Sequence, residues 1–243
     1  MIVSMDKMGN KPNQLADGDF YECCALAVTD IAGNMDGRLY SNDFIYAATL
    51  FLEGVTPGVD PDGSEPWTAF QSACAYGLLP QLVAPFTSQT KGELYASDFR
   101  NYIQQYRTIA LDYTKKAPKN VGVDYFGVIN YIKATGQGVA IPMTWFESFM
   151  GITNSILPAP SGATSAHCPV AYVADTGELV IKPWLGSTWG DGGYAVLPKA
   201  LFDALVTDAF SFDANGNRWL TILAILITKY PYLVDYYSQL VQI

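Results

Sequence analysis

The chain has 243 residues, half of them hydrophobic and 15% charged, and its formal net charge is -9. This length and composition allow a sizeable buried core and are not typical of intrinsic disorder. With 14 basic residues in total and no basic run, the sequence argues against nucleic acid and anionic membrane surfaces as partners, because both require clustered Lys and Arg.

Neither an export signal nor a membrane span is predicted. The first 14 residues are polar and lack the apolar core of a signal peptide. The longest apolar run, Trp219–Ile227, is far shorter than the ~20 residues that span a bilayer, and it predicts a buried strand. We therefore expect a cytoplasmic location by default, or a chain carried in a particle or released by lysis, neither of which needs a signal.

The first half of the chain has the spacing of helices. Helices are expected over residues 23–32, 44–53, 66–76 and 96–106. Gly33 is expected to end the first of them, and Ser41, Asn42 and Asp43 to cap the second. Residues 113–120, with three lysines and a proline, are expected to cross over on the surface.

The second half is richer in predicted strands. Strands are expected over residues 139–143, 170–173, 179–182, 194–197 and 220–227, and helices over 123–134 and 198–206. A helical first half followed by a strand-rich second half predicts an α+β protein of two lobes.

Four cysteines are present, and two of them, Cys23 and Cys24, are adjacent. Adjacent cysteines rarely form a disulfide without strain, and the spacing of Cys and His does not match a zinc site. We expect reduced thiols, and no metal.

Cys23 and His167 are the candidate catalytic pair. Cys23 begins a predicted helix, where the helix dipole favours a thiolate, although buried free cysteines are more commonly structural. His167 is the only histidine, and a lone histidine beside an apolar run is usually structural as well. A cysteine near the N-terminus with a histidine about 130–150 residues downstream is, however, the spacing expected of papain-like thiol proteases.

The sequence also resembles the papain-like cysteine peptidase family in its motifs. Cys-Cys-Ala-Leu-Ala at 23–27 is similar to the family's nucleophile helix, Cys-Trp-Ala-Phe-Ala/Ser, and His-Cys-Pro-Val at 167–170 is similar to its His-Ala-Val strand. Lys-Pro-Trp-Leu-Gly-Ser-Thr-Trp-Gly-Asp-Gly-Gly-Tyr at 182–194 resembles Lys-Asn-Ser-Trp-Gly-Thr-Ser-Trp-Gly-Asp-Gly-Gly-Tyr. Weaker similarities at 41–46, 63–79, 136–141 and 149–152 follow the family's order, so the match runs from about residue 14 to 197.

The resemblance implies one α+β domain with a papain-like two-lobed fold. The helical lobe is expected over residues 14–115 and the antiparallel, barrel-like β lobe over 116–229. Trp184 and Trp189 are expected to pack the glycine-rich loop. The aromatic tail, residues 230–243, is expected to dock on the body or on a partner in a larger assembly.

The resemblance further implies peptide-bond hydrolysis by a Cys–His dyad through a thioester acyl-enzyme. Cys23 would be the nucleophile and His167 the base. The oxyanion would be bound by the Cys23 backbone N–H and by Gln14, if the following loop carries a three-residue insertion. The substrate would be a peptide or protein, and no cofactor is implied.

Two departures from the family favour a second hypothesis. Pro183 stands where the family has the Asn that orients the histidine, and Asp17 stands at the usual position of the oxyanion Gln. Proline has no side-chain donor or acceptor, and a carboxylate would repel an oxyanion. Together with the lack of a recognisable pro-segment before Cys23, these changes favour a catalytically decayed fold that serves as a structural or binding module.

Overall fold

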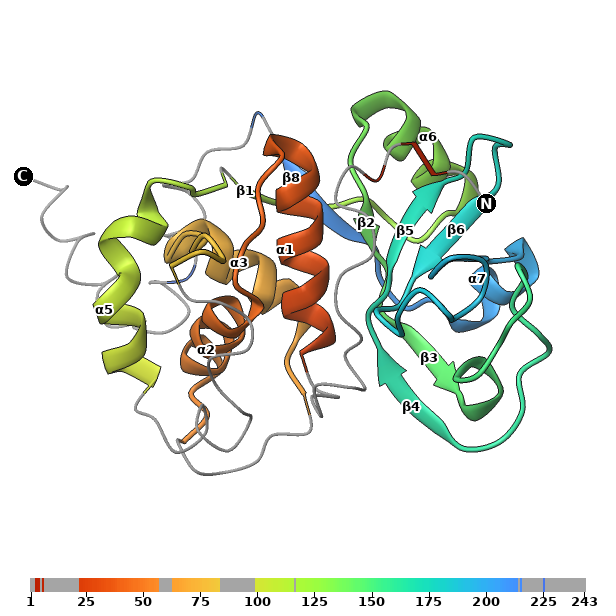
Figure 1. Ribbon diagram of the computed structural model, residues 1–243, viewed down its shortest axis with the longest axis horizontal. Coiled ribbons are helices and arrows are strands. Elements are labelled where there is room, and N and C mark those ends of the chain that lie inside the picture. Colours follow the sequence, from red (N-terminus) through yellow and green to blue (C-terminus); the bar gives the residue numbers. More distant parts are fainter. Residues whose placement is uncertain are drawn as a thin grey trace, which may run out of the picture.

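The computed structural model describes residues 3, 4, 6, 22–56, 63–83, 99–115, 117–213, 215 and 225. Helix α1 (Cys23–Asp36) runs between a group of helices on one side and a β-sheet on the other (Figure 1). The other helices are α2 (Asn42–Glu53), α3 (Pro66–Ala75), α5 (Phe99–Leu111), α6 (Tyr125–Thr135) and α7 (Lys199–Leu205), with a 3-10 turn at Glu147–Phe149. The strands are β1 (Ala117–Asn120), β2 (Val139–Ala140), β3 (Met143–Phe146), β4 (Thr164–His167), β5 (Val170–Val173), β6 (Leu179–Lys182), β7 (Ala195–Val196) and β8 (Phe210–Asp213). The predicted α+β class is confirmed.

Helix α1 is buried nearly all round. Its residues from Cys24 to Asn34 are all buried, because it contacts α2 and α3 on one side and β2, β5 and β8 on the other. The helix ends at Asp36, and Gly37 follows in the left-handed conformation, with φ 75°. The prediction that Gly33 ends this helix is therefore wrong, because packing on both sides outweighs the low helix propensity of one glycine.

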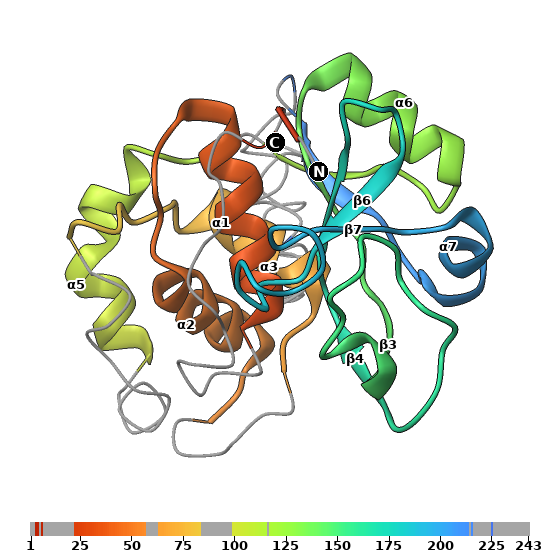
Figure 2. The same ribbon diagram turned by 45° about the vertical axis from the view of Figure 1, so that its right-hand side comes forward.

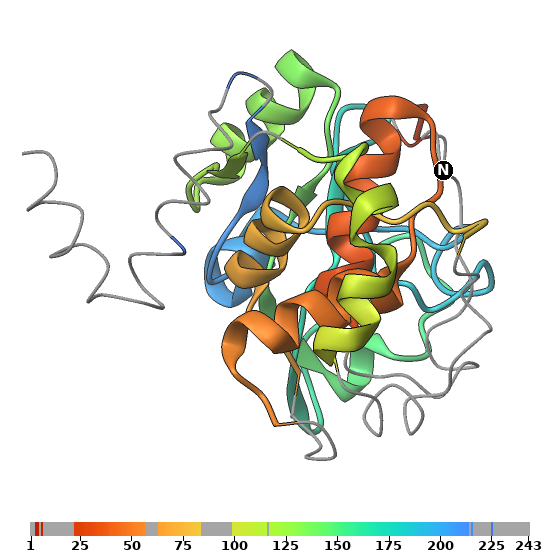
Figure 3. The same cartoon turned by 90° about the vertical axis from the view of Figure 1, so that its left-hand side faces the viewer.

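Helices α2 and α3 begin within two residues of their predicted starts, whereas α5 continues to Leu111, five residues beyond the end predicted at residue 106. Ser41 caps α2, and its hydroxyl accepts the backbone N–H of Phe44 at 3.3 Å. Pro66 is the first residue of α3, a position where the missing N–H costs no helix bond. Figure 3 looks onto this side and shows α5 (yellow-green) in front of α1 (orange-red).

The main sheet has six strands in the order β1-β8-β2-β5-β6-β7, and all the pairings are antiparallel. Strands β3 and β4 form a separate antiparallel pair, in which Met143 lies opposite His167. Helices α6 and α7 lie beyond the sheet, on the side away from α1 (Figure 2). Strands β5 and β6 match their predicted bounds.

Three strand expectations need correction. Residues 113–120 are not only a surface crossover, because β1 occupies the last four of them and pairs with β8. The single strand expected over 139–143 is interrupted at Ile141 and Pro142, and a second strand, β3, begins at Met143. The strand expected over 194–197 is reduced to β7. The strand expected over 220–227 and the tail lie outside the described residues, apart from residue 225.

Strands β5 and β6 separate two hydrophobic clusters. Side chains alternate across a strand, so Val170 and Tyr172 point to the helical cluster around α1, whereas Ala171 and Val173 point to the cluster beneath α6 and α7. Both faces of each strand are buried, which explains why the two strands are apolar throughout except for Lys182 at the end of β6.

Candidate active site

Cys23 is the first residue of α1. Its side chain is half-buried, whereas the next residue, Cys24, is 4% exposed. The first backbone hydrogen bond of the helix runs from Leu26 N–H to the Glu22 carbonyl, at 2.9 Å. The N–H groups before Leu26, including that of Cys23, therefore have no carbonyl partner within the helix.

The pKa of the Cys23 thiol is raised well above its usual range. The neighbouring Cys24 sulfur and burial both favour the neutral form, and a hydrogen bond with His167 opposes them. Local contacts thus outweigh the helix dipole that the sequence suggested would favour a thiolate. These contacts favour the neutral thiol of Cys23 over the thiolate.

His167 is the last residue of β4, and it is close enough to Cys23 to lower the pKa of the Cys23 thiol. On its other side the His167 Nε2 atom is 3.0 Å from the Pro183 carbonyl oxygen. The ring of Trp145 packs edge-on against the imidazole, with 4.8 Å between ring centroids. Strand pairing places Trp145 opposite Ser165, two residues before His167. Sequence reasoning missed Trp145, which no motif identifies.

The segment after β6 contains the unusual backbone of the site. Trp184, which is 2% exposed, has φ 64° and is the only non-glycine residue with positive φ in the part of the chain that the structure describes. Trp189, the second predicted packing residue, is 3% exposed and donates its indole N–H to the Phe149 carbonyl at 2.7 Å. Pro183 is therefore adjacent to a strained residue, and its carbonyl points at His167.

Buried charges fix the end of β6. The Lys182 ammonium is 2.6 Å from an Asp6 carboxylate oxygen and 3.2 Å from one of Asp30, and all three side chains are at most 1% exposed. The Tyr172 hydroxyl donates to Asp30 at 2.6 Å, and that of Tyr194 donates to Asp6 at 2.5 Å. The ion pairs satisfy the buried ammonium and hold the residue just before Pro183 in place.

Two further thiols lie next to the candidate pair. Cys24 donates its Sγ–H to the Ser64 carbonyl at 3.2 Å, and Cys168 is 2% exposed. The pKa of Cys24 is raised by Cys168 and by burial. A hydrogen bond with Cys24 lowers the pKa of Cys168, but burial and Cys23 outweigh it, so that this pKa is raised as well. All four cysteines are free, as the sequence predicts. Cys23 is the least buried of them and the one whose pKa His167 lowers.

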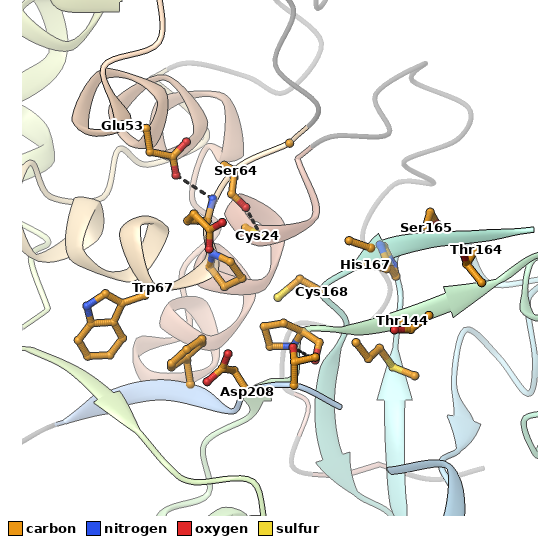
Figure 4. A pocket seen from close by; sticks show the side chains of 18 residues that line it. Cys24, Glu53, Ser64, Trp67, Thr144, Thr164, Ser165, His167, Cys168 and Asp208 are labelled. Atoms are coloured by element: carbon orange, nitrogen blue, oxygen red, sulfur yellow. Dashed lines mark hydrogen bonds between the residues drawn. The ribbon is translucent and has the colours of Figure 1, made fainter. Parts of the chain in front are cut away.

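A cavity of about 790 Å³ opens beside these groups. Figure 4 shows Glu53, Ser64 and Trp67 on its helical side and Thr144, Thr164 and Ser165 on the strand side, with Cys24, His167 and Cys168 between them. Trp67 is 37% exposed and Thr164 and Ser165 are exposed, so the cavity is open to solvent. It is large enough for several side chains of an extended peptide.

Glu53 is the perturbed carboxylate of the cavity. Burial raises its pKa to about 7, although one of its oxygens accepts the Glu65 backbone N–H at 2.7 Å. Asp208 lines the opposite end, and the lining contains no Lys or Arg among the described residues. Apart from His167, the ionisable side chains of the described lining other than cysteines are therefore all carboxyl groups.

The predicted oxyanion residue Gln14 lies outside the described residues, as does Asp17. No group of His, Cys, Asp and Glu in the described ranges has the geometry to hold a metal ion. The helices that the structure describes include none that is both long and apolar enough to cross a membrane.

Comparison with solved structures shows which fold this is. Xylellain, a cysteine protease from Xylella fastidiosa, superposes with a TM-score of 0.66 and 16% identity over 88% of this chain and 93% of that one. The Carica candamarcensis cysteine protease CMS1MS2 gives a TM-score of 0.60 and 16% identity over 89% and 98% of the two chains. Digestive procathepsin L 3 of Tenebrio molitor gives 0.59 and 14% over 87% and 75%. The chain has the papain-like fold that its sequence predicts.

Likeness at this identity extends to the fold and not to activity. Searches against models of known protein families and against curated proteins found no match.

Proposed function

We propose that the protein is a cysteine peptidase that hydrolyses peptide bonds with a Cys–His dyad, Cys23 and His167, within a single papain-like domain. The observation that carries this proposal is the position of the only histidine. It lies beside the half-buried thiol at the start of α1, next to an open cavity, with its second ring nitrogen held by a hydrogen bond. A purely structural histidine would not need that combination.

In the first half of the reaction, the His167 Nδ1 atom takes the proton of the Cys23 thiol as the sulfur attacks the carbonyl carbon of the scissile bond. The negative charge that develops on the carbonyl oxygen is stabilised by the Cys23 backbone N–H and, as the sequence resemblance assigns, by the amide of Gln14. The imidazolium then protonates the leaving amine, the C–N bond breaks, and a thioester remains on Cys23.

In the second half, the neutral His167 takes a proton from water, whose oxygen attacks the thioester carbon. The C–S bond breaks, the acid product leaves, and the proton on His167 returns to the Cys23 sulfur. Because the resting Cys23 is a neutral thiol, the proton transfer to His167 is part of the acylation step.

The test is labelling of the full chain with a peptidyl fluoromethyl ketone, followed by mass spectrometry of the modified peptide. Labelling is expected on Cys23 and is expected to disappear in Cys23→Ala and His167→Ala. Cys24→Ala is the matched control, because it removes the adjacent sulfur and is expected to keep the modification. No labelling of the folded wild-type chain, or labelling of Cys24 instead, would favour the decayed binding module.

A further inference from the structure

We infer that the main-chain carbonyl of Pro183, and not a side chain, is the group that orients His167 for catalysis. This inference rests on the proposed function, because orientation matters only if His167 acts as a base. It makes Pro183 a positioning residue that acts through its main-chain carbonyl, because its side chain offers no donor or acceptor. Proline at this position then no longer counts against activity.

The direction of the hydrogen bond follows from the chemistry of the acceptor. The Pro183 carbonyl oxygen, 3.0 Å from His167 Nε2, can only accept, so the Nε2 atom must carry the proton. In a neutral imidazole the other nitrogen, Nδ1, is then unprotonated. That is the nitrogen left to face the Cys23 sulfur and accept its proton.

The backbone around residue 183 explains why the carbonyl points at the imidazole. The orientation of the peptide group between Pro183 and Trp184 depends on the torsion angles of both residues. The pyrrolidine ring fixes φ of Pro183, and Trp184 takes the left-handed φ of 64° that a bulky residue adopts only where its surroundings require it. Strained residues of this kind are concentrated at functional sites.

The surroundings hold that conformation from both sides. Lys182, one residue before Pro183, is bound by the buried carboxylates of Asp6 and Asp30. The Trp184 indole is buried, with the Lys182 ammonium 4.7 Å from its ring centroid. The peptide group of Pro183 thus lies between two immobilised side chains, which makes its carbonyl a preorganised acceptor.

A main-chain carbonyl can do the work of a side-chain amide oxygen. Both are neutral acceptors of comparable strength, and neither titrates near neutral pH. The carbonyl has no side-chain rotamers to lose, so its position depends only on the backbone. What the family achieves with a residue type is achieved here with a backbone conformation.

The single histidine makes the tautomer directly measurable. In the full chain labelled with 15N-histidine, a long-range proton–nitrogen correlation spectrum contains one imidazole and identifies which nitrogen is protonated. We expect the Nε2–H tautomer, with a slowly exchanging proton, in the absence of any substrate. A protonated Nδ1 in the neutral ring, or a fast equilibrium between both tautomers, would overturn the inference.

Matched variants at residue 184 test the role of the backbone. Trp184→Asn and Trp184→Val both remove the indole, but asparagine tolerates positive φ and a β-branched valine does not. We expect Trp184→Asn to keep the Nε2–H tautomer and Trp184→Val to give a mixture, with kcat at least 10-fold lower for Val than for Asn.

Equal tautomer populations in the Asn and Val variants, both shown to be folded by circular dichroism, would contradict the backbone mechanism. The outcome is separable from the proposed function, because the tautomer is read without turnover. A wild-type Nε2–H tautomer in a chain whose Cys23 is never labelled would refute the peptidase and, with it, the catalytic meaning of this hydrogen bond.

Discussion

The helical side and the strand side of the molecule hold the two residues of the proposed dyad by different means. On the helical side, Cys23 is placed by the frame of α1, a helix buried between other helices and the sheet, and its neighbour Cys24 lines the cavity. On the strand side, His167 is placed by contacts with its own ring: the Pro183 carbonyl at Nε2 and the edge-on Trp145. The position of the proposed nucleophile therefore depends on global packing, and that of the proposed base depends on a few local contacts that single substitutions can remove.

The largest expected effect comes from removing either reactive side chain. Cys23→Ala is expected to abolish peptide hydrolysis, because no thioester forms. His167→Ala is expected to lower kcat by about 10²–10⁴-fold, because the Cys23 thiol loses the base that takes its proton. Steady-state hydrolysis of a fluorogenic peptide measures both. Activity of His167→Ala equal to the wild type would show that the strand side contributes no base.

The second prediction concerns the buried ion pairs of Lys182 on the strand side. Lys182→Met is expected to lower the free energy of unfolding by about 3–5 kcal/mol, because the Asp6 and Asp30 carboxylates are left buried without their cation. Chemical denaturation measures the change. The control is Lys199→Met, whose exposed ion pair with Asp203 is expected to contribute less than about 1 kcal/mol. Equal losses in the free energy of unfolding for the two variants would show that the buried ion pairs stabilise the fold no more than the exposed pair does.

The third prediction concerns pH and the helical side. Glu53 has a pKa of about 7 in the folded protein, above its ordinary value of 4.5, so the folded state binds more protons than the unfolded state between these pH values. The contribution of Glu53 to the free energy of unfolding is fully present below about pH 4.5 and is lost as the pH rises through about 7. The loss is about 1–2 kcal/mol once solvent screening is allowed for.

In Glu53→Gln this part of the pH dependence is expected to disappear, while the oxygen that accepts the Glu65 N–H is kept. Denaturation of the wild type and the variant at pH 4.5, 6 and 7.5 gives the comparison. Parallel stability profiles would mean that Glu53 ionises normally.

The smallest expected effect comes from removing a single hydrogen bond on the helical side, the cap of α2. Ser41→Ala removes the cap of α2 and is expected to cost about 1 kcal/mol in stability, with kcat unchanged, because α1 keeps its other contacts. Thermal denaturation and kcat measured on the same sample provide the check. A fall in kcat beyond about 3-fold would show that the Cys23 side is as sensitive to local contacts as the His167 side.

The sequence predicts most of the fold because the elements that carry it have strong local patterns. The papain-like order of motifs, the Ser41 cap and the apolar strands β5 and β6 all agree with the structure. Strand β1 was missed because Ala-Pro-Lys-Asn has no strand pattern. It exists because it lies at the edge of the sheet and pairs with β8, where a proline is tolerated.

The candidate site was predictable only where side chains carry its chemistry. Cys23 and His167 follow from residue type and spacing. The partner of His167 does not, because it is a main-chain carbonyl and every residue has one. The positive φ of Trp184 could not be predicted either, because bulky aromatic residues rarely adopt it. Trp145 was missed for a related reason, since only the pairing of β3 with β4 brings it to the imidazole.

The buried contact between Asp6 and Lys182 also has a consequence for biosynthesis. The two residues are 176 positions apart, and the ribosome adds roughly 5–20 residues per second. Roughly 10–35 s therefore pass between the synthesis of Asp6 and that of Lys182. His167 is translated shortly before Lys182. Pro183, whose carbonyl accepts the hydrogen bond from His167, is translated directly after Lys182. The nascent chain therefore completes the cavity late in its own synthesis, because the lining residues Thr207, Asp208 and Phe210 also follow Lys182 in the sequence.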